Sequence, residues 1–432
     1  MKKLVLWKFL ILGLLVNAQN EQPNILWIVC EDISPTLSFY GDSTAKTPNL
    51  DALAKESLIF DNAFTPVGVC APSRSSIITG MHPTSIGTMH MRTGKDVMSW
   101  GKRTYNRDIE VKDLKGNAIR QYAVVVPAEV KCFPEYLRAN GYFCTNNQKT
   151  DYQFAAPVTA WDQNYGRAHW RNSPKNKPFF SVFNIDLTHE SKLWKHEKLP
   201  LTVAKKSVPV PPYLPNTEIS RKTIAKNYSN IELMDKKVGS ILRQLKEDGL
   251  YDNTIVFFYS DHGGPLPRQK REILDSGLKV PFMIKFLNST KKGRTDRLIS
   301  FVDLAPTILS LAKIKPSKYF EGEAFLGNYE GKEREYVYGS SDRFDEYSDR
   351  IRSVRNKRYL YLKNDYPKLT KYKDVGYRKS VPMMQNILDL KNKGTLDSIQ
   401  NKWFATKDVE ELYDCVEDPH NLHNLAKDSN YE

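Results

Sequence analysis

The sequence predicts an α/β protein with a mixed, largely parallel central sheet flanked by helices and a smaller C-terminal α+β subdomain. Two observations lead to this class. Short, continuously apolar runs typical of buried strands alternate with amphipathic helical segments over the first three quarters of the chain. After about residue 330 the pattern changes to short Tyr- and Arg-rich strands, which place a separate unit at 331–432.

Each predicted strand is a run of branched and aromatic residues without the alternation of a half-exposed sheet. Such continuous runs are typical of parallel strands that are covered on both faces. Four runs have this pattern: Asn24–Cys30, Pro178–Ile185, Thr254–Ser260 and Val280–Phe286.

The helices between these strands are indicated by apolar residues at helical spacing and by residues typical of helix ends. Segments 100–125 and 190–220 lack such spacing and are predicted to be long loops; the second is rich in Lys and Pro. Three segments carry the helical pattern: Asn49–Ser57, Val130–Asn140 and Ala225–Glu247. In the C-terminal unit, Tyr336–Ser340 and Arg350–Leu362 are predicted to form short strands.

The first 18 residues have the features of a signal peptide. Lys2 and Lys3 precede the apolar run Leu4–Val16, and Val16 and Ala18 fit a small-residue cleavage site. We therefore expect an exported protein, periplasmic or secreted, whose mature chain divides into a larger unit, residues 19–330, and a smaller C-terminal unit, residues 331–432. No later segment reaches 18 uninterrupted apolar residues, so stable membrane insertion is not expected.

The 432 residues carry a formal net charge of +14, so an anionic partner or a solvated lysine-rich surface would each fit. No helix-turn-helix, zinc-finger or RRM signature accompanies the charge, and nucleic acid is not an expected partner. Five cysteines are too few for a disulfide framework in so long a chain. Cys132 and Cys144 could pair in an oxidising compartment, and the odd count leaves at least one free thiol.

Acidic and imidazole groups follow three of the four predicted strands. The first strand runs into Glu31 and Asp32, the second into Asp186 and His189, and the third into Asp261 and His262. Ligands bind at the carboxyl ends of such strands, and clustered carboxylates need a cation between them. At one strand end these residues would be turn formers; three together predict a divalent metal, Ca²⁺ or Mg²⁺.

A second motif follows the first helix. Pro72 in Cys70-Ala-Pro-Ser-Arg74 suits a first helical turn, which puts Cys70 at a helix N-terminus where negative charge is favoured. Arg74 lies one turn later on the same face. Core packing explains a cysteine among Pro, Ser and Arg poorly.

These motifs resemble the type I (formylglycine-dependent) sulfatases of the alkaline phosphatase superfamily. The Cys-x-Pro-Ser-Arg sequence followed by Thr-Gly is the signature of that family. The resemblance spans nearly all of the mature chain, implies the alkaline phosphatase/sulfatase-like fold, and is carried in order by Asn24–Asp32, Thr47–Ala63, Cys70–Gly80, Ile231–Gly264, Gly277–Pro281 and Glu411–Leu425.

The resemblance implies that a maturation enzyme oxidises Cys70 to formylglycine, whose hydrate attacks sulfur. It also implies that Glu31, Asp32, Asp261 and His262, with the oxygen of residue 70, hold a divalent metal. Two of these ligands depart from the family pattern, which usually has Asp at the first position and often Asn at the last. The nitrogen ligand His262 weakens the case for Ca²⁺ and admits Mg²⁺ or another divalent ion.

Further roles come from the same resemblance. Arg74 would pair with the nucleophile and the sulfate oxygens, and Lys149 and Lys270 would place cations on the sulfate. His189 would protonate the departing sugar oxygen. From spacing alone the two lysines would be surface residues. Asp151 stands where many members have a His that aids collapse of the intermediate, so it is either a base or an orienting residue.

Four basic residues are candidates for substrate binding. His90 and Arg92 follow the signature helix by about one loop, and Arg343 and Arg350 lie where the C-terminal unit could cover the pocket. Basic groups there would suit a uronic acid or a second sulfate. Loop structure and a charged hairpin explain them equally well.

The sequence therefore predicts an exported sulfatase that hydrolyses sulfate esters of a polysaccharide or its oligosaccharides, of the ulvan, carrageenan, fucoidan or glycosaminoglycan type. A formylglycine-generating enzyme is the expected partner. The alternatives are a phosphoester or phosphonate hydrolase of the same superfamily and a glycan-binding relic whose Cys70 is never matured.

Overall fold

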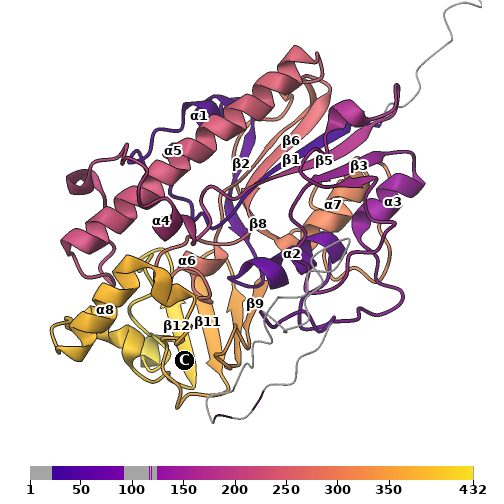
Figure 1. Ribbon diagram of the computed structural model, residues 1–432. Coiled ribbons are helices and arrows are strands. Elements are labelled where there is room, and N and C mark those ends of the chain that lie inside the picture. Colours follow the sequence, from indigo (N-terminus) through magenta and orange to yellow (C-terminus); the bar gives the residue numbers. More distant parts are fainter. Residues whose placement is uncertain (1–21, 92–115, 117, 119–123, 432) are drawn as a thin grey trace, which may run out of the picture.

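The computed structural model describes residues 22–91, 116, 118 and 124–431, and its centre is an eight-stranded mixed sheet (Figure 1). The strand order is β4-β3-β5-β1-β6-β7-β2-β8, and only β7 pairs antiparallel with its neighbours. The predicted α/β class with a largely parallel sheet is confirmed. The strands are β1 (Asn24–Cys30), β2 (Leu58–Phe64), β3 (Phe143–Asn147), β4 (Gln163–Asn164), β5 (Phe179–Ile185), β6 (Thr254–Ser260), β7 (Phe282–Lys285) and β8 (Gly293–Ser300).

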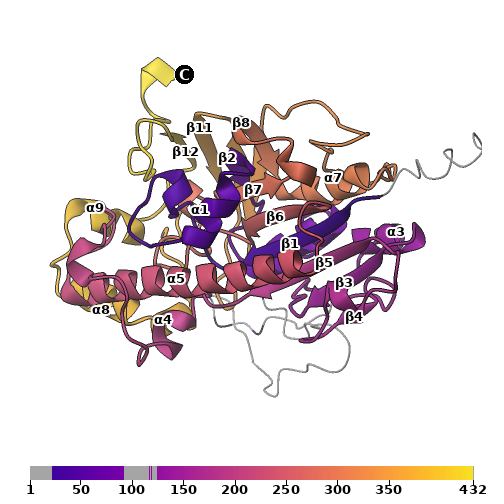
Figure 2. The same cartoon turned by 90° about the horizontal axis from the view of Figure 1, so that it is seen from above.

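Helices cover both faces of this sheet, α1 and α5 on one side and α2, α3 and α7 on the other (Figure 2). Alternate residues of β1 serve the two faces: Leu26 and Ile28 face α5, whereas Ile25 and Trp27 face α3 and α7. The helices are α1 (Pro48–Ala54), α2 (Cys70–Thr79), α3 (Phe133–Ala139), α4 (Lys192–Lys195), α5 (Glu218–Glu247), α6 (Asp275–Leu278), α7 (Leu304–Leu311), α8 (Pro382–Asn392) and α9 (Ser398–Asn401).

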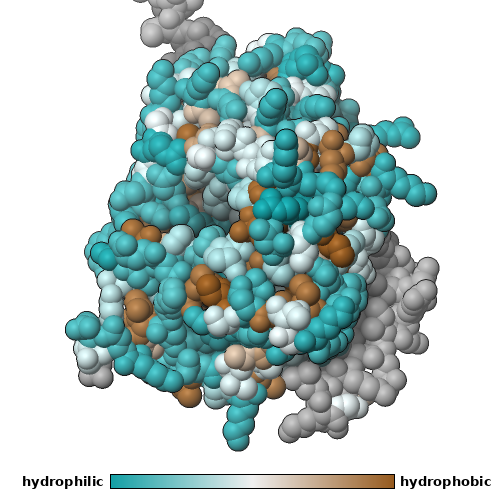
Figure 3. Space-filling model, turned by 90° about the vertical axis from the view of Figure 1, so that its left-hand side faces the viewer, coloured by the Kyte–Doolittle hydropathy of each residue, from teal (hydrophilic) through white to brown (hydrophobic). Residues whose placement is uncertain are grey.

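The C-terminal part forms a second, four-stranded antiparallel sheet in the order β12-β11-β10-β9. An apolar cluster that includes Phe64, Leu278 and Leu298 of the first part and Ile351 and Leu362 of the second joins the two sheets. The face that carries α5 and α8 is largely hydrophilic with small scattered hydrophobic spots (Figure 3). The strands of this sheet are β9 (Val337–Ser341), β10 (Ile351–Arg355), β11 (Tyr359–Asn364) and β12 (Glu410–Asp414).

Several sequence predictions need correction. Segment 190–220 is not one long loop, because it contains α4 and the first residues of α5, where the Thr217 hydroxyl caps the helix by accepting from the Ser220 N–H. Strands β2, β3 and β8 and helix α7 were not predicted from the sequence. Cys132 and Cys144 do not pair: both thiols are free and buried.

Two further predictions fall largely or wholly outside the described residues. The signal peptide does so entirely, as does most of segment 100–125. Within the part of the chain that the structure describes, no helix has both the length and the apolarity needed to cross a bilayer.

We predict that Phe257→Ala in β6 destabilises the fold by about 3–5 kcal/mol, because large-to-small changes in a packed core lose burial and leave a cavity. The Phe257 side chain is fully buried, with its ring 6.1 Å from those of both Trp27 and Phe282. Urea unfolding measures the loss. Tyr366→Ala at an exposed position is the control, and a loss below about 1 kcal/mol for Phe257→Ala would contradict this account of the core.

Candidate active site

The candidate site lies where three parallel strands end side by side. Strand β1 lies between β5 and β6 with matched register at the carboxyl ends, where Cys30 pairs with Ile185 and with Ser260. The residues that follow these strands therefore meet at one edge of the sheet. Glu31 and Asp32 come from β1, and Asp261 and His262 come from β6. His189 follows β5 after a short turn.

Two carboxylates and one imidazole converge in the fully buried centre of the site. The His262 Nε2 atom lies 3.1 Å from Asp32 Oδ1 and 3.7 Å from Asp261 Oδ1. Apart from this contact with each other, neither Asp32 Oδ1 nor His262 Nε2 has a hydrogen-bond partner within the described structure. Buried polar atoms without partners are costly, so their convergence fits a ligand between them. Glu31, Asp32 and His189 form a second, overlapping group of ligand atoms.

The other ring nitrogen of His262 sets the state of this imidazole. Nδ1 lies 3.0 Å from the Gly263 carbonyl oxygen, which can only accept, so Nδ1 donates its proton. Once it loses its second proton, the ring presents a lone pair at Nε2, as metal-bound histidines do. Burial lowers the pKa of His262, but the carboxylates of Asp261 and Asp32 outweigh it and raise the pKa to about 10. The site thus draws in positive charge, and its donor set fits a divalent metal.

Each of the three acidic residues also has a cationic side chain beside it. Lys270 Nζ lies 2.6 Å from Asp32 Oδ2, and Lys149 Nζ lies 2.6 Å from Glu31 Oε2. Arg74 Nε donates to Asp261 Oδ2 at 3.0 Å. The predicted sulfate-binding cations therefore converge on the predicted metal ligands, although they come from distant parts of the sequence.

The lysines and the carboxylates of the site shift each other's pKa values. Burial would lower the pKa of Lys270 and of Lys149, but the facing carboxylates raise both above their ordinary value. Burial would raise the pKa of Asp32, but Lys270 and the two histidines hold it well below the usual range. Glu31 differs, because burial outweighs Lys149 and raises its pKa. Of Glu31, Asp32 and Asp261, Glu31 is therefore the carboxylate that is protonated most readily.

His189 lies at the edge of the cluster with its Nε2 atom 3.9 Å from Glu31 Oε2. The Ser191 backbone N–H donates to His189 Nδ1 at 3.2 Å, so the neutral ring carries its proton on Nε2, the atom nearer Glu31. Burial and the charge of Lys270 lower the pKa of His189 to about 2. A neutral ring with Nε2–H directed at the site can donate a hydrogen bond to a leaving oxygen, and it has to take up a second proton before it can act as a general acid.

Cys70 begins α2 and is buried beside the cluster, as the Pro72 signal predicts. Its side chain packs against Met91 and Phe344, and its sulfur interacts with His262. Arg74 lies one turn later on the same helix, where its second contact is a 2.7 Å donation to Asn184 Oδ1. A group at position 70 thus lies at a helix N-terminus and next to the candidate metal ligands.

Asp151 is buried with its carboxylate 3.9 Å from Lys149 Nζ. Its backbone has a φ of +53°, a conformation that Asp tolerates better than most residues. Asp32 shares this feature, also with a φ of +53°. Asp151 is therefore linked to the candidate metal ligands by Lys149, which contacts both Asp151 and Glu31.

The candidate substrate-binding residues lie in two different places. His90 Nδ1 accepts from the Arg343 backbone N–H at 3.2 Å, and the Arg343 guanidinium donates to the Met91 carbonyl oxygen. These two residues join the segment beside Cys70 to the C-terminal part. Arg350 is instead on the exposed surface, in an ion pair with Asp365 at 2.9 Å. Arg92 lies outside the described residues.

Sequence reasoning missed three residues that support the site. The Glu190 backbone N–H donates to Asp32 Oδ2 at 2.7 Å, and Arg271 holds both Glu190 carboxylate oxygens at 3.0 Å. These residues follow His189 and Lys270 directly, so the buried Arg271–Glu190 pair holds the two active-site loops together. Asn184 was detectable as a polar residue near the end of a strand that is otherwise apolar except for Ser181.

Fold and site together define a class of α/β enzyme: a sheet edge that gathers acidic and imidazole metal ligands, cations for a small anion, and a nucleophile position at a helix N-terminus. Residues 23–314 match the sulfatase family, and residues 268–401 match the C-terminal part of N-sulphoglucosamine sulphohydrolase. The chain belongs to the sulfatase family of the alkaline phosphatase superfamily and is a sulfuric ester hydrolase.

Similar proteins agree with this assignment. An ulvan-active sulfatase of Formosa agariphila is 44% identical over 449 residues, which cover 95% of this chain and 72% of that protein. A solved structure of a Bacteroides thetaiotaomicron protein, described in connection with the metabolism of multiple glycosaminoglycans, superposes with a TM-score of 0.65 at 17% identity. The match covers 95% of this chain and 93% of that chain. The phosphonate monoester hydrolase of Agrobacterium radiobacter has a TM-score of 0.61 at 14% identity, with 95% and 92% covered. At these identities the two structures support the fold alone.

We predict that metal affinity rises with pH over the neutral range. Because the pKa of His262 is about 10, a metal ion must displace a proton from the ring below that pH. The affinity for Ca²⁺ or Mg²⁺ should therefore increase about tenfold per pH unit while other ligands stay ionised. Isothermal titration calorimetry at pH 6, 7 and 8 measures this change. A dissociation constant that does not depend on pH would show that Nε2 is already unprotonated in the metal-free protein.

Proposed function

We propose that this protein is an exported sulfatase that removes sulfate esters from a sulfated polysaccharide or its oligosaccharides, with ulvan as the first candidate. The observation that carries the proposal is the placement of Cys70 at the start of α2, among three cationic side chains and the candidate metal ligands. The 44% identity to an ulvan-active sulfatase supports the choice of substrate. Glycosaminoglycan, carrageenan and fucoidan fragments are the other substrates of this type.

The side chains of the site divide the work of ester hydrolysis. Arg74, Lys149 and Lys270 hold the sulfate oxygens and offset the negative charge that develops on them. The imidazolium form of His189 would transfer its Nε2 proton to the bridging oxygen and return to the neutral ring, so the sugar leaves as an alcohol. Asp151 orients Lys149.

Two groups complete this chemistry. A divalent metal held by Glu31, Asp32, Asp261 and His262 supplies Lewis acidity toward the sulfate ester. Oxidation of Cys70 to formylglycine by a formylglycine-generating enzyme supplies an oxygen nucleophile in place of a thiol. The carboxylates favour Ca²⁺, while the nitrogen of His262 also accepts Mg²⁺ or another divalent ion.

The site of action is proposed from the N-terminal sequence. Lys2, Lys3 and the apolar run Leu4–Val16 support export through a signal peptide. We place the mature enzyme in a periplasm first and outside the cell second. Either location gives it access to polysaccharide fragments.

One observation favours a second candidate function. The nitrogen ligand at His262 is compatible with phosphoester or phosphonate hydrolysis. An unmatured glycan-binding relic is less well supported, because the four ligands, Arg74 and both lysines are all present.

The test is inorganic sulfate release by the mature chain co-expressed with a formylglycine-generating enzyme. Sulfated oligosaccharides of the four types are offered beside phosphate and phosphonate esters. We expect sulfate from the ulvan fragments. Phosphate or phosphonate hydrolysis without sulfate release would move the protein to the second function, and activity that persists in Cys70→Ala would refute the proposed nucleophile.

A further inference from the structure

The site opens to solvent on the side of His189 and Lys149. The side chains of Asp32, Asp261, His262 and Lys270 are almost completely buried. By contrast, those of Lys149 and His189 are 20% and 18% exposed. A sulfate ester with its sulfur at the cluster therefore has its leaving group on this side.

Two aromatic side chains lie next to His189 at this opening. The Tyr377 ring centroid is 6.4 Å from that of His189 and 5.3 Å from that of Trp194, which it meets edge-to-face. Tyr377 is 43% exposed, and Trp194 is partly exposed. The charges of Lys270 and Asp32 both act on the pKa of the Tyr377 hydroxyl, so this residue is close to the cluster.

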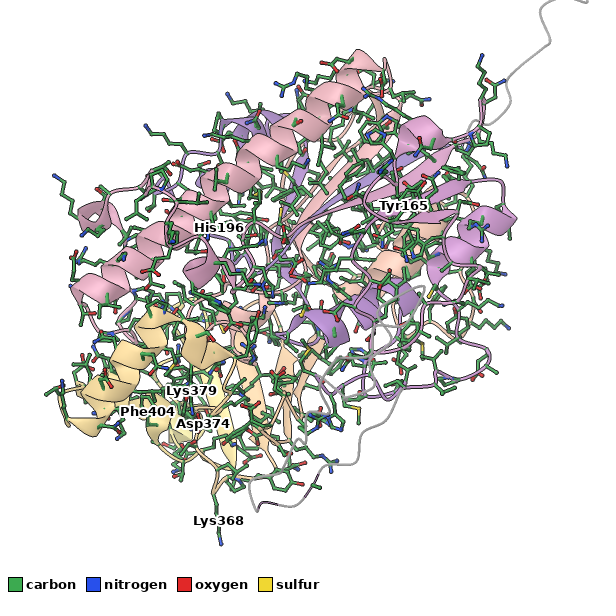
Figure 4. The ribbon with its side chains drawn as sticks, in the orientation of Figure 1. Tyr165, His196, Lys368, Asp374, Lys379 and Phe404 are labelled. Atoms are coloured by element: carbon green, nitrogen blue, oxygen red, sulfur yellow. The ribbon has the colours of Figure 1, made fainter. Side chains whose placement is uncertain are left out.

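The two rings come from different parts of the chain. Trp194 lies in α4, after β5, and Tyr377 lies in the C-terminal part. Figure 4 labels His196, the C-cap residue that follows α4, and Lys379, two residues after Tyr377, and shows them on the two parts. The Arg271 guanidinium lies 5.9 Å from the centroid of the Tyr377 ring in a cation–π contact. Because Arg271 also binds Glu190, the position of Tyr377 is coupled to the loop of His189.

An exposed aromatic surface beside the leaving-group side has a clear chemical use. The C–H face of a pyranose ring is apolar, whereas its edge is ringed with hydroxyl groups, so a sugar packs one face on an aromatic ring. A polar rim suits the hydroxyls, and here Lys379 pairs with Asp374 at 2.6 Å two residues beyond Tyr377. A lipid or an apolar peptide would need a wider hydrophobic surface than the scattered spots on the α5 and α8 face.

We propose that Tyr377 and Trp194 form the surface that binds the sugar ring carrying the sulfate. This inference rests on the proposed function and adds to it the residues that recognise the leaving group. The pair selects sulfate esters of pyranose rings over those of small alcohols. It acts on binding, while His189 keeps its own role in proton donation.

The test compares Tyr377→Ala, Tyr377→Phe and Trp194→Phe with the wild type on sulfated ulvan oligosaccharides. Tyr377→Ala should lower kcat/KM about tenfold, mainly through a higher KM, since an aromatic contact of this kind is worth about one decade in affinity. Tyr377→Phe keeps the ring and should remain within about twofold of the wild type. Tyr366→Ala, an equally exposed tyrosine of the same part of the chain, is the matched control and should change nothing.

Two further measurements separate sugar binding from a positioning role. Inorganic sulfate has no sugar ring, so its inhibition constant should be equal in Tyr377→Ala and the wild type, and the pH profile of kcat should not move. An unchanged KM in Tyr377→Ala overturns the proposal. A changed sulfate inhibition constant or pH profile also overturns it, because Tyr377 would then act through His189.

Failure of this inference is distinguishable from failure of the proposed function. If the wild type releases no sulfate from any glycan, the proposed function fails. Direct titration of sulfated oligosaccharide into the Cys70→Ala protein then still tests the surface. The comparison protein carries both Cys70→Ala and Tyr377→Ala. If it binds the oligosaccharide about tenfold more weakly than Cys70→Ala alone, the result supports the aromatic surface. Equal binding by both proteins refutes it.

Discussion

Cys70→Ala is expected to abolish sulfate release, with a loss on the order of 10⁵- to 10⁶-fold in kcat, the size seen when a nucleophile is removed from a catalytic unit. The reason is chemical, because alanine offers neither a thiol for maturation nor an oxygen for attack on sulfur. The fold should survive. Cys70 is buried in a small cluster with Met91 and Phe344, and removing one sulfur there leaves little space. Sulfate release and thermal unfolding, measured on the same preparation, check both statements.

Two controls make this result interpretable. The mass of the peptide that contains residue 70 shows whether the wild-type thiol has been converted to the aldehyde, which any comparison of activity requires. Cys415→Ala changes another free cysteine, in the C-terminal part of the chain, and should leave activity intact. Substantial activity in Cys70→Ala with authentic mass would place the nucleophile elsewhere.

The centre of the site was predictable because strand ends in a parallel sheet converge. The apolar runs Asn24–Cys30 and Thr254–Ser260 coincide with β1 and β6 residue for residue, and the polar pairs after them meet as expected. The pattern of apolar residues and the parallel arrangement of the strands were sufficient to predict the centre of the site.

Lys149 and Lys270 could not be placed in this way. Both lie in loops, after β3 and after β6, and loop paths leave no periodic signal. Only the family motif pointed to them. Strand β3 itself was missed because its sequence ends Thr-Asn-Asn, residues that favour turns, and burial beside β5 outweighs that local preference.

Glu190 and Arg271 illustrate a different limit. Each is charged and lies next to a site residue, so its sequence is typical of a solvated loop. Their bidentate contact exists only because two loops 81 residues apart pack together. Buried ion pairs of this kind follow from tertiary structure and not from local pattern.

Asp32→Asn is expected to remove the metal and, with it, activity by about 10³-fold or more, since even partners of metal ligands cost 10- to 100-fold when changed. Both carboxylate oxygens of Asp32 have contacts within the site. Its Oδ2 atom accepts from Lys270 and from the Glu190 N–H, while Oδ1 lies 3.1 Å from His262 Nε2 and has no further hydrogen-bond partner among the described residues. Asparagine keeps the shape but loses the charge, so Lys270 is left buried beside a neutral amide and the pull on a cation weakens.

Metal content by elemental analysis and Ca²⁺ affinity by calorimetry should fall together with sulfate release. Asp186→Asn is the matched control. This aspartate also follows a strand of the same sheet, but it is largely exposed and pairs with Lys192 at 2.8 Å. It should therefore keep its metal and its activity. If Asp32→Asn bound metal like the wild type and yet lost activity, the role of Asp32 would be to hold Lys270 against the sulfate. If Asp186→Asn lost metal as well, the ligand set would extend to the end of β5.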